Sequence, residues 1–230
     1  MKLLLTRPER DAGATAARLV VLGYEVVVAP VTAIVATGDP VPAGDFAAVL
    51  ATSANAFRTL DAEDRIRLQD TPLHCVGEKT AKVARDSGFQ SVITGGGSGE
   101  KLVDDIKAAY PAGLSLLYLT GNPRKPVVEK GLRAAGFAVA SVELYRAQPV
   151  TEWPGPWRSE LADVDVALHF SRASVEVLLD LAGKAGVLSD LRRMRHLCLS
   201  DDVAVPLKAS GMPLIGIADR ATEDHLIALI

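Results

Sequence analysis

The residues of this sequence that could do chemistry gather in short polar segments, each following an apolar run. The segments are 6–8, 52–55, 77–80, 94–99, 120–124, 171–174 and 200–202, and they include Arg7, Ser53, Asn55, Gly77, Thr80, Gly121, Arg124, Ser171 and Ser174. If each apolar run is a strand and each segment opens a helix, free backbone N–H groups and the helix dipole make these segments suited to anions. Ser, Thr and Asn are also ordinary helix N-caps, which is the simpler interpretation of any single one. Taken as a set, the residues favour an anionic ligand.

Tyr145 stands apart from these segments because it ends an apolar run just before a proline-rich stretch. A phenol at that position could pack between two domains, or it could face a cleft between them. The sequence alone leaves both interpretations open.

Several familiar catalytic motifs are missing from the sequence. The segment Gly95–Lys101 resembles a phosphate loop, but the Gly-Lys-Ser/Thr of a Walker motif does not follow. No Gly-x-Gly-x-x-Gly follows a predicted strand, and no Gly-x-Ser-x-Gly elbow occurs. The four histidines are scattered, and Cys75 and Cys198 lie inside predicted strands, where buried small hydrophobes are expected. We therefore expect neither a metal ion nor a cofactor.

Strand-like and helical patterns alternate along the whole sequence. The strand-like runs are mostly continuous Val, Leu, Ile and Ala, which is typical of strands buried on both faces of a parallel sheet. Gly23, Gly88, Gly136 and Gly211 each follow a helical stretch, as a helix-ending glycine does. The fold class indicated is α/β.

Two types of β-α-β unit each occur twice. The unit that begins with Leu3–Arg7 is repeated from Leu116, and the unit that begins at Val49 is repeated from Ala167. Repeats of this kind are best sought before any other feature. The chain therefore has the internal order A-B-A′-B′.

Proline and glycine clusters predict where the domains meet. They place linkers at 36–45 and 149–164, which bracket the middle of the chain. We expect two flavodoxin-like parallel-sheet domains, 1–35 plus 165–230 and an inserted 46–148, joined by a two-stranded linker. Leu5 and Leu168 should share one sheet, and Leu50 and Leu119 the other. Trp153 and Trp157 should pack the second linker onto a domain surface, although a ligand-stacking role is the alternative.

Composition narrows the classes of protein that this chain can represent. With 230 residues, 49% hydrophobic and 23% charged, it has the make-up of a globular protein. A net charge of −3 argues against a nucleic-acid surface. No apolar run reaches the roughly 18 residues of a membrane span, and Met1–Leu5 is too short for a signal peptide. We expect a cytoplasmic monomer that binds neither nucleic acid nor membrane.

The sequence resembles the uroporphyrinogen-III synthase family over essentially its whole length. The resemblance is carried by the order and spacing of short motifs: Thr6-Arg7-Pro8, Thr52-Ser53-Ala54-Asn55-Ala56, Val76-Gly77-Glu78-Lys79-Thr80-Ala81, Leu119-Thr120-Gly121 with Arg124, Glu143-Leu144-Tyr145, and Phe170-Ser171-Arg172-Ala173-Ser174. One departure is Ser200-Asp201-Asp202-Val203-Ala204, where the family often has Gly-x-x-Thr-Ala. This departure puts a ligand role for Ser200 in doubt.

The resemblance implies a hydro-lyase that needs no cofactor or metal. Its substrate would be the linear tetrapyrrole hydroxymethylbilane, which loses water and closes with inversion of ring D to give uroporphyrinogen III. Tyr145 would then be a general acid. The binding residues implied are Arg7, Ser53, Asn55, Gly77, Thr80, Gly121, Arg124, Ser171 and Ser174. The alternative from another class is a non-catalytic two-domain binding protein for a small anionic ligand.

Overall fold

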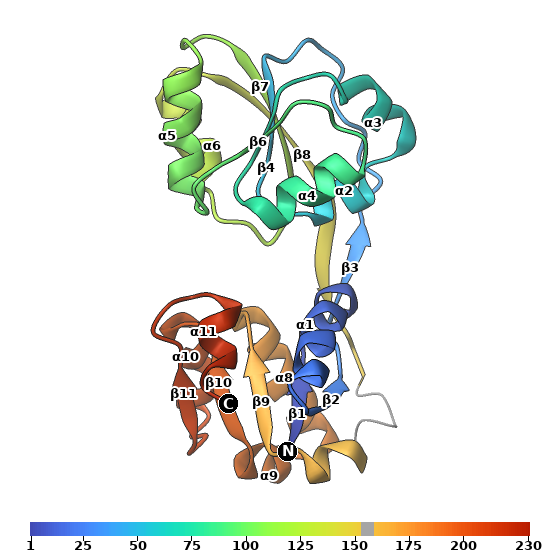
Figure 1. The fold of residues 1–230 in the computed structure, drawn as a ribbon, viewed down its shortest axis with the longest axis vertical. Coiled ribbons are helices and arrows are strands. Elements are labelled where there is room, and N and C mark those ends of the chain that lie inside the picture. The colour runs from blue at the N-terminus through green and yellow to red at the C-terminus, as the bar shows by residue number, and fades with distance from the viewer. Residues whose placement is uncertain (153–158) are drawn as a thin grey trace. The chain divides into compact units, whose positions relative to one another are not determined.

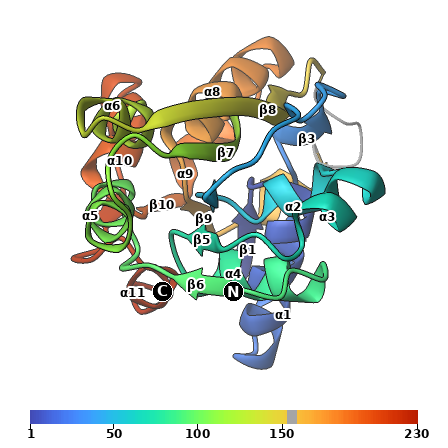
Figure 2. The same ribbon diagram turned by 90° about the horizontal axis from the view of Figure 1, so that it is seen from above.

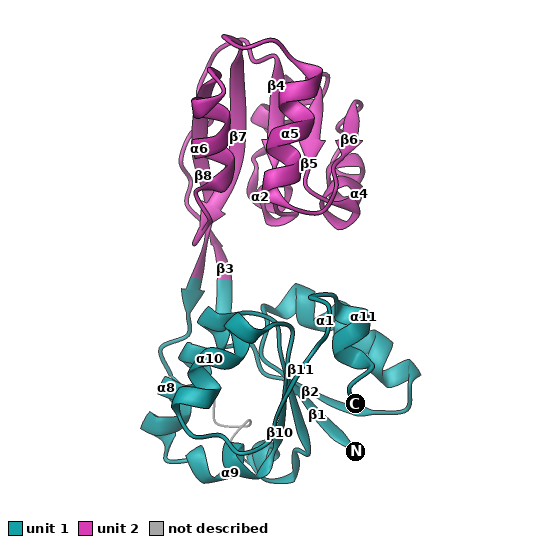
Figure 3. Cartoon of the chain, turned by 90° about the vertical axis from the view of Figure 1, so that its left-hand side faces the viewer, with its two compact units in different colours: residues 1–33, 148–230 teal, residues 34–147 magenta. Residues whose placement is uncertain are grey.

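The computed structural model describes residues 1–152 and 159–230, drawn as a ribbon in Figure 1. The described chain divides into two compact units (Figure 3). Unit 1 comprises Met1–Ala33 and Gln148–Ile230, and unit 2 comprises Ile34–Ala147. Trp153 and Trp157, expected to pack the second linker, lie outside the described residues.

Unit 1 is built on a five-stranded sheet in the order β11-β10-β9-β1-β2. Its strands are β1 (Lys2–Leu5), β2 (Glu25–Val28), β9 (Val166–His169), β10 (Arg195–Cys198) and β11 (Ile215–Ile217). All of their pairings are parallel. Leu5 and Leu168 share this sheet, as predicted, and they are paired in register. The helices are α1 (Glu9–Val21), η1 (Leu161–Asp163), α8 (Arg172–Ala185), α9 (Leu188–Arg193), α10 (Asp201–Ala209) and α11 (Glu223–Ile227).

Helices cover both faces of the unit 1 sheet. Alternate residues of a strand point to opposite faces. Leu4 therefore joins the core under α8, α9 and α10, whereas Leu3 and Leu5 join the core under α1 and α11. Leu161 and Val164, which the sequence places in the second linker, are buried in the unit 1 core because their side chains are apolar. Burial on both faces explains why the strands read as continuous apolar runs.

Unit 2 is built on a six-stranded sheet in the order β3-β8-β7-β4-β5-β6. Its strands are β3 (Thr32–Ala36), β4 (Ala48–Ala51), β5 (Leu73–Cys75), β6 (Val92–Thr94), β7 (Ser115–Asn122) and β8 (Ala138–Pro149). The pairings among β4 to β8 are parallel. Strand β3 runs antiparallel to β8. Two hydrogen bonds show this direction: Thr37 N–H donates to the Leu144 carbonyl, and Val150 N–H donates to the Val31 carbonyl. Both strands cross the boundary between the units, as the two colours of Figure 3 show.

The unit 2 helices also form two layers. They are α2 (Asn55–Thr59), α3 (Ala62–Leu68), α4 (Glu78–Asp86), α5 (Gly99–Ala109) and α6 (Val127–Ala134). Leu50 and Tyr118 point toward α5 and α6, whereas Ala51 and Leu119 point toward α2, α3 and α4. Figure 2 shows the same separation, with α5 and α6 on one side of the sheet.

The two units share one strand arrangement although the chain enters them differently. Counted from β1 through β2, β9, β10 and β11, the unit 1 sheet has the flavodoxin-like order 2-1-3-4-5. Counted from β7 through β8, β4, β5 and β6, the parallel part of the unit 2 sheet has the same order. Unit 2 is therefore a circular permutation of unit 1, which follows from the order A-B-A′-B′ read in the sequence.

The helices begin and end at the residue types that the sequence predicts for helix termini. The four glycines expected to end helices, Gly23, Gly88, Gly136 and Gly211, all have positive φ angles, between 68° and 99°. Asp61, Ser98, Ser171 and Thr222 cap helix starts through their side chains, as short polar residues do at this position.

Cys75 and Cys198 lie in the hydrophobic cores, as expected for cysteines inside apolar strands. Cys75 and Cys198 are buried, and burial raises the pKa of each thiol to about 12. Within residues 1–152 and 159–230, His, Cys, Asp and Glu form no group of three that could hold a metal ion. Among the same residues, no helix is both long and apolar enough to cross a membrane.

Candidate functional site

A pocket of about 490 Å³ lies at the carboxyl edge of the unit 2 sheet. The segments that follow β4 and β5, the loop before α5, and the turn between β7 and α6 all contribute to it. Its lining residues are Thr52, Ser53, Val76, Gly97, Ser98, Gly99, Glu100, Tyr118, Thr120, Pro123, Arg124, Lys125, Val127, Val128 and Tyr145. In parallel α/β sheets this edge is where ligands bind.

Tyr145 occupies a tightly defined position in the pocket wall. The β7–β8 register shifts between Thr120 and Gly121, which places Gly121 opposite Tyr145. A Cβ on Gly121 would overlap the Tyr145 ring far inside van der Waals contact. Gly121, predicted as a binding residue, thus makes room for the phenol.

The environment of Tyr145 keeps its phenol protonated at neutral pH. Burial raises the pKa of Tyr145, a hydrogen bond with the Ser53 side chain opposes the rise, and the Tyr118 charge adds to it. The net shift is upward from 10.0. A neutral phenol in a half-buried wall can donate a proton or a hydrogen bond.

The β4–α2 segment supplies further hydroxyls. Thr52 Oγ1 lies 3.0 Å from the hydroxyl of the buried Tyr118. Ser53 Oγ accepts a hydrogen bond from Asn55 N–H at 3.2 Å, and Asn55 Oδ1 accepts one from Arg58 at 2.7 Å. Ser53 lines the pocket, whereas the amide oxygen of Asn55 already has a partner within the protein.

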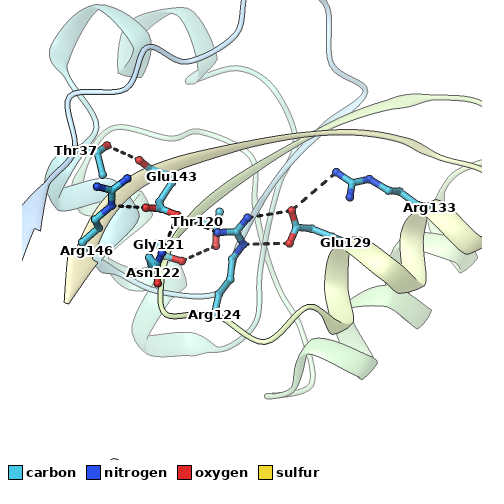
Figure 4. Close-up of polar contacts among 9 residues, drawn as sticks. All are labelled: Thr37, Thr120, Gly121, Asn122, Arg124, Glu129, Arg133, Glu143 and Arg146. Atoms are coloured by element: carbon cyan, nitrogen blue, oxygen red, sulfur yellow. Dashed lines mark hydrogen bonds and ion pairs between the residues drawn. The ribbon is translucent and has the colours of Figure 1, made fainter. Parts of the chain in front are cut away.

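Arg124 is held between two carboxylates (Figure 4). Its Nε and Nη2 donate to both oxygens of Glu129 at 3.1 and 3.3 Å, and its Nη1 donates to Glu143 at 3.2 Å. The other oxygen of Glu143 accepts from Arg146 at 2.6 Å. The bond from Arg124 is the largest influence lowering the pKa of Glu129, and the bond from Arg146 is the largest lowering that of Glu143. Both carboxylates are therefore ionised at neutral pH.

Gly77 and Thr80 lie outside the residues that line the pocket. Gly77 precedes α4, and its carbonyl accepts a hydrogen bond from Thr80 N–H at 3.1 Å. Thr80 is only 6% exposed. In this structure the two residues begin a helix.

The remaining candidates belong to unit 1 and contact partners within it. Arg7 Nη1 donates to Glu223 at 2.9 Å and to the Thr15 hydroxyl at 2.9 Å, and its guanidinium lies 4.0 Å from the Phe170 ring centroid. Ser171 caps α8, where its hydroxyl accepts from Ser174 N–H and donates to Ser174 Oγ.

Sequence reasoning did not select several residues that line the pocket. Tyr118 lies in strand β7, Thr52 follows the last residue of β4, and Lys125 follows Arg124. The glycine-rich segment before α5 was expected among the polar segments that follow strands, but none of its residues was named as a binding residue. Gly97, Ser98 and Gly99 of this segment line the pocket.

Comparison with known proteins gives the chain its family. A family model described as "Uroporphyrinogen-III synthase HemD" matches residues 13–228. The uroporphyrinogen-III synthase of Saccharomyces cerevisiae is 33% identical over 104 residues. That alignment covers 41% of this chain and 37% of the yeast protein, so the chain spans little more than a third of this curated relative.

Solved structures show the same fold. Uroporphyrinogen-III synthetase from Helicobacter pylori superimposes with a TM-score of 0.71 at 15% identity, covering 99% of this chain and 97% of that one. A mutant uroporphyrinogen III synthase from Thermus thermophilus gives a TM-score of 0.55 at 21% identity, covering 100% and 96%. With a family model that matches nearly the whole sequence, the chain belongs to the uroporphyrinogen-III synthase HemD family.

Proposed function

We propose that this protein is a uroporphyrinogen-III synthase, a hydro-lyase that acts on hydroxymethylbilane. The observation that carries the proposal is the family match over residues 13–228. In the proposed reaction the linear tetrapyrrole loses its terminal hydroxyl as water, ring D attacks through its substituted carbon, and fragmentation and reclosure yield uroporphyrinogen III.

The unit 2 pocket offers what the first step needs. The departing ring-A hydroxyl must gain a proton, and the protonated phenol of Tyr145 stands in the pocket wall. We assign Tyr145 as the general acid that donates this proton, so that the hydroxyl leaves as water and an azafulvene remains. Ser53, through its hydrogen bond to the phenol, orients it.

The larger part of the task is geometric. Spontaneous closure gives the uninverted isomer, so the protein must hold the chain folded for one closure. Such positioning can contribute about 7–11 kcal/mol. The substrate carries acetate and propionate carboxylates, which backbone N–H groups at helix starts can bind without a basic surface.

The other residues of the proposed binding set differ in whether their side chains already have a partner inside the protein. Arg7 and Arg124 would have to exchange an internal carboxylate for one of the substrate. Asn55, Gly77, Thr80, Gly121, Ser171 and Ser174 would act through backbone groups or by shaping helix starts. We further propose a cytoplasmic monomer that needs no cofactor or metal.

The test is to supply hydroxymethylbilane from a generating system and to identify the porphyrinogen isomer. We expect the type III isomer to replace the type I isomer that forms spontaneously. Production of type I alone, at the rate seen without protein, would refute the proposal and leave binding of an anionic ligand as the function.

A further inference from the structure

We propose that Lys125, and not its neighbour Arg124, provides the cation that binds a substrate carboxylate in the unit 2 pocket. This inference rests on the proposed function, and it assigns the specificity-determining charge of the same site.

The positive charge of Arg124 is already paired with carboxylates of the protein. Its three nitrogens contact Glu129 and Glu143 at 3.1–3.3 Å, and all three side chains are partly shielded, with exposed fractions of 30%, 12% and 18%. To bind a substrate carboxylate, Arg124 would have to leave two carboxylates that are themselves half-buried. Breaking these pairs is unfavourable because partly shielded charges lose hydrogen bonds that stabilise them.

Lys125 is placed differently although it is the next residue. Lys125 lines the pocket and is exposed, and it forms no ion pair with any residue in 1–152 or 159–230. A lysine ammonium is a compact, mobile charge with three donors, so it can follow carboxylates at the rim of a flexible tetrapyrrole. Two described cations line the pocket, Arg124 and Lys125, and of these only Lys125 has no ion pair within the described part of the chain.

Glu100 is the acidic residue that lines the pocket together with Lys125, and it does not form an ion pair with Lys125. Glu100 lines the same pocket, and its carboxylate accepts hydrogen bonds from its own backbone N–H and from the Ser98 hydroxyl. These bonds hold it at the start of α5, where a negative charge is favourable. Lys125 also influences Glu100 through its charge, but the two are not in contact as an ion pair.

The Arg124 pairs have a positioning role in this arrangement. They connect the turn between β7 and α6 to Glu129 on α6 and to Glu143 on β8 (Figure 4). Pro123 and Pro126 further restrict the φ angles of the same turn. A turn fixed at both ends presents Lys125 to the pocket with little loss of backbone freedom on binding.

The experiment compares four variants with the unmodified protein. Lys125→Gln removes the positive charge, whereas Lys125→Arg keeps it. Lys130→Gln is the control, because Lys130 is an exposed residue of α6 that does not line the pocket. Arg124→Gln removes the ion pairs with Glu129 and Glu143. We expect Lys125→Gln to raise KM for hydroxymethylbilane roughly three- to tenfold with kcat within about twofold. Lys125→Arg should return KM to within about twofold, and Lys130→Gln should leave KM unchanged.

Binding of uroporphyrin III, the stable oxidised form of the expected product, separates this inference from the proposed function. Its quenching of protein fluorescence gives a Kd that does not depend on turnover. A Kd raised by Lys125→Gln supports the inference even if the unmodified protein forms no type III product. An unchanged KM and Kd in Lys125→Gln, a larger KM effect in an intact Arg124→Gln, or no uroporphyrin III binding by the unmodified protein would each overturn it.

Discussion

Acidification from pH 7 to pH 5 should destabilise unit 1 through a buried pair of histidines. His169 and His196 stack with their ring centroids 5.2 Å apart, and His169 Nε2 lies 3.0 Å from His196 Nδ1. His196 Nε2 is 2.9 Å from the Leu191 carbonyl, which can only accept. His196 therefore donates from Nε2, its Nδ1 accepts from His169 Nε2, and His169 Nδ1 keeps a buried lone pair without a partner among the described residues.

Both rings are thus neutral in the folded protein. Burial, with a contribution from the adjacent His196, lowers the pKa of His169 from 6.5 to about 3, and burial also lowers the pKa of His196. Below pH 6.5 the His169 ring is protonated in the unfolded chain, whereas in the folded protein it stays neutral down to about pH 3. The free energy of unfolding is therefore not reduced by His169 above pH 6.5, and it decreases as the pH falls below this value. At pH 5 the loss from His169 alone is about 2 kcal/mol, at 1.36 kcal/mol per pH unit.

Urea unfolding followed by circular dichroism at pH 7 and pH 5 measures this loss. Carboxylates with depressed pKa values, such as Glu129 and Glu143, stay ionised over this range and contribute little to the change. His169→Leu should be less sensitive to the same step, whereas His225→Gln, which alters a histidine in the C-terminal helix α11, should behave like the unmodified protein. An equal free energy of unfolding at both pH values, or an NMR titration of His169 near 6.5, would refute this reasoning.

Other perturbations test the site. Tyr145→Phe should keep the fold and lower type III formation on the order of 10²-fold, because the proposed acid is lost; an unchanged rate and isomer ratio would assign the phenol to packing. Gly121→Ala should displace the Tyr145 ring, with a similar loss of rate and about 1–3 kcal/mol of stability; full activity would show that the ring position is unimportant. Arg124→Gln should cost about 1–3 kcal/mol, seen as a lower urea midpoint, because Glu129 and Glu143 lose their hydrogen bonds from the guanidinium. Exhaustive dialysis against chelator should leave synthase activity unchanged, and recovery of lost activity with a divalent ion would contradict that expectation.

The sequence predicts the sheets well because both the apolar runs and the repeats are local signals. Leu5 and Leu168 do share the unit 1 sheet, and Leu50 does lie in the unit 2 sheet. Burial of Cys75 and Cys198 follows from the same runs.

The partners of the polar side chains could not be predicted in the same way. Arg7 meets Glu223, which lies 216 positions away, and Arg124 meets Glu143 on the next strand. A motif shows that an arginine follows a strand, but it does not show which carboxylate the folded chain brings to it. The register shift beside Gly121 likewise depends on how β7 and β8 align, so the fit of Tyr145 against that glycine has no signature in either strand.

The circular permutation has a consequence for synthesis on the ribosome. The strands of unit 2 form one uninterrupted stretch that is finished with β8, whereas β1 must wait for β9 before its second edge is paired. Unpaired strand edges promote aggregation. The β1–β2 pair of the nascent chain is therefore exposed while unit 2 is already able to fold. A chaperone that binds the segment from β1 to β2 would act during this interval.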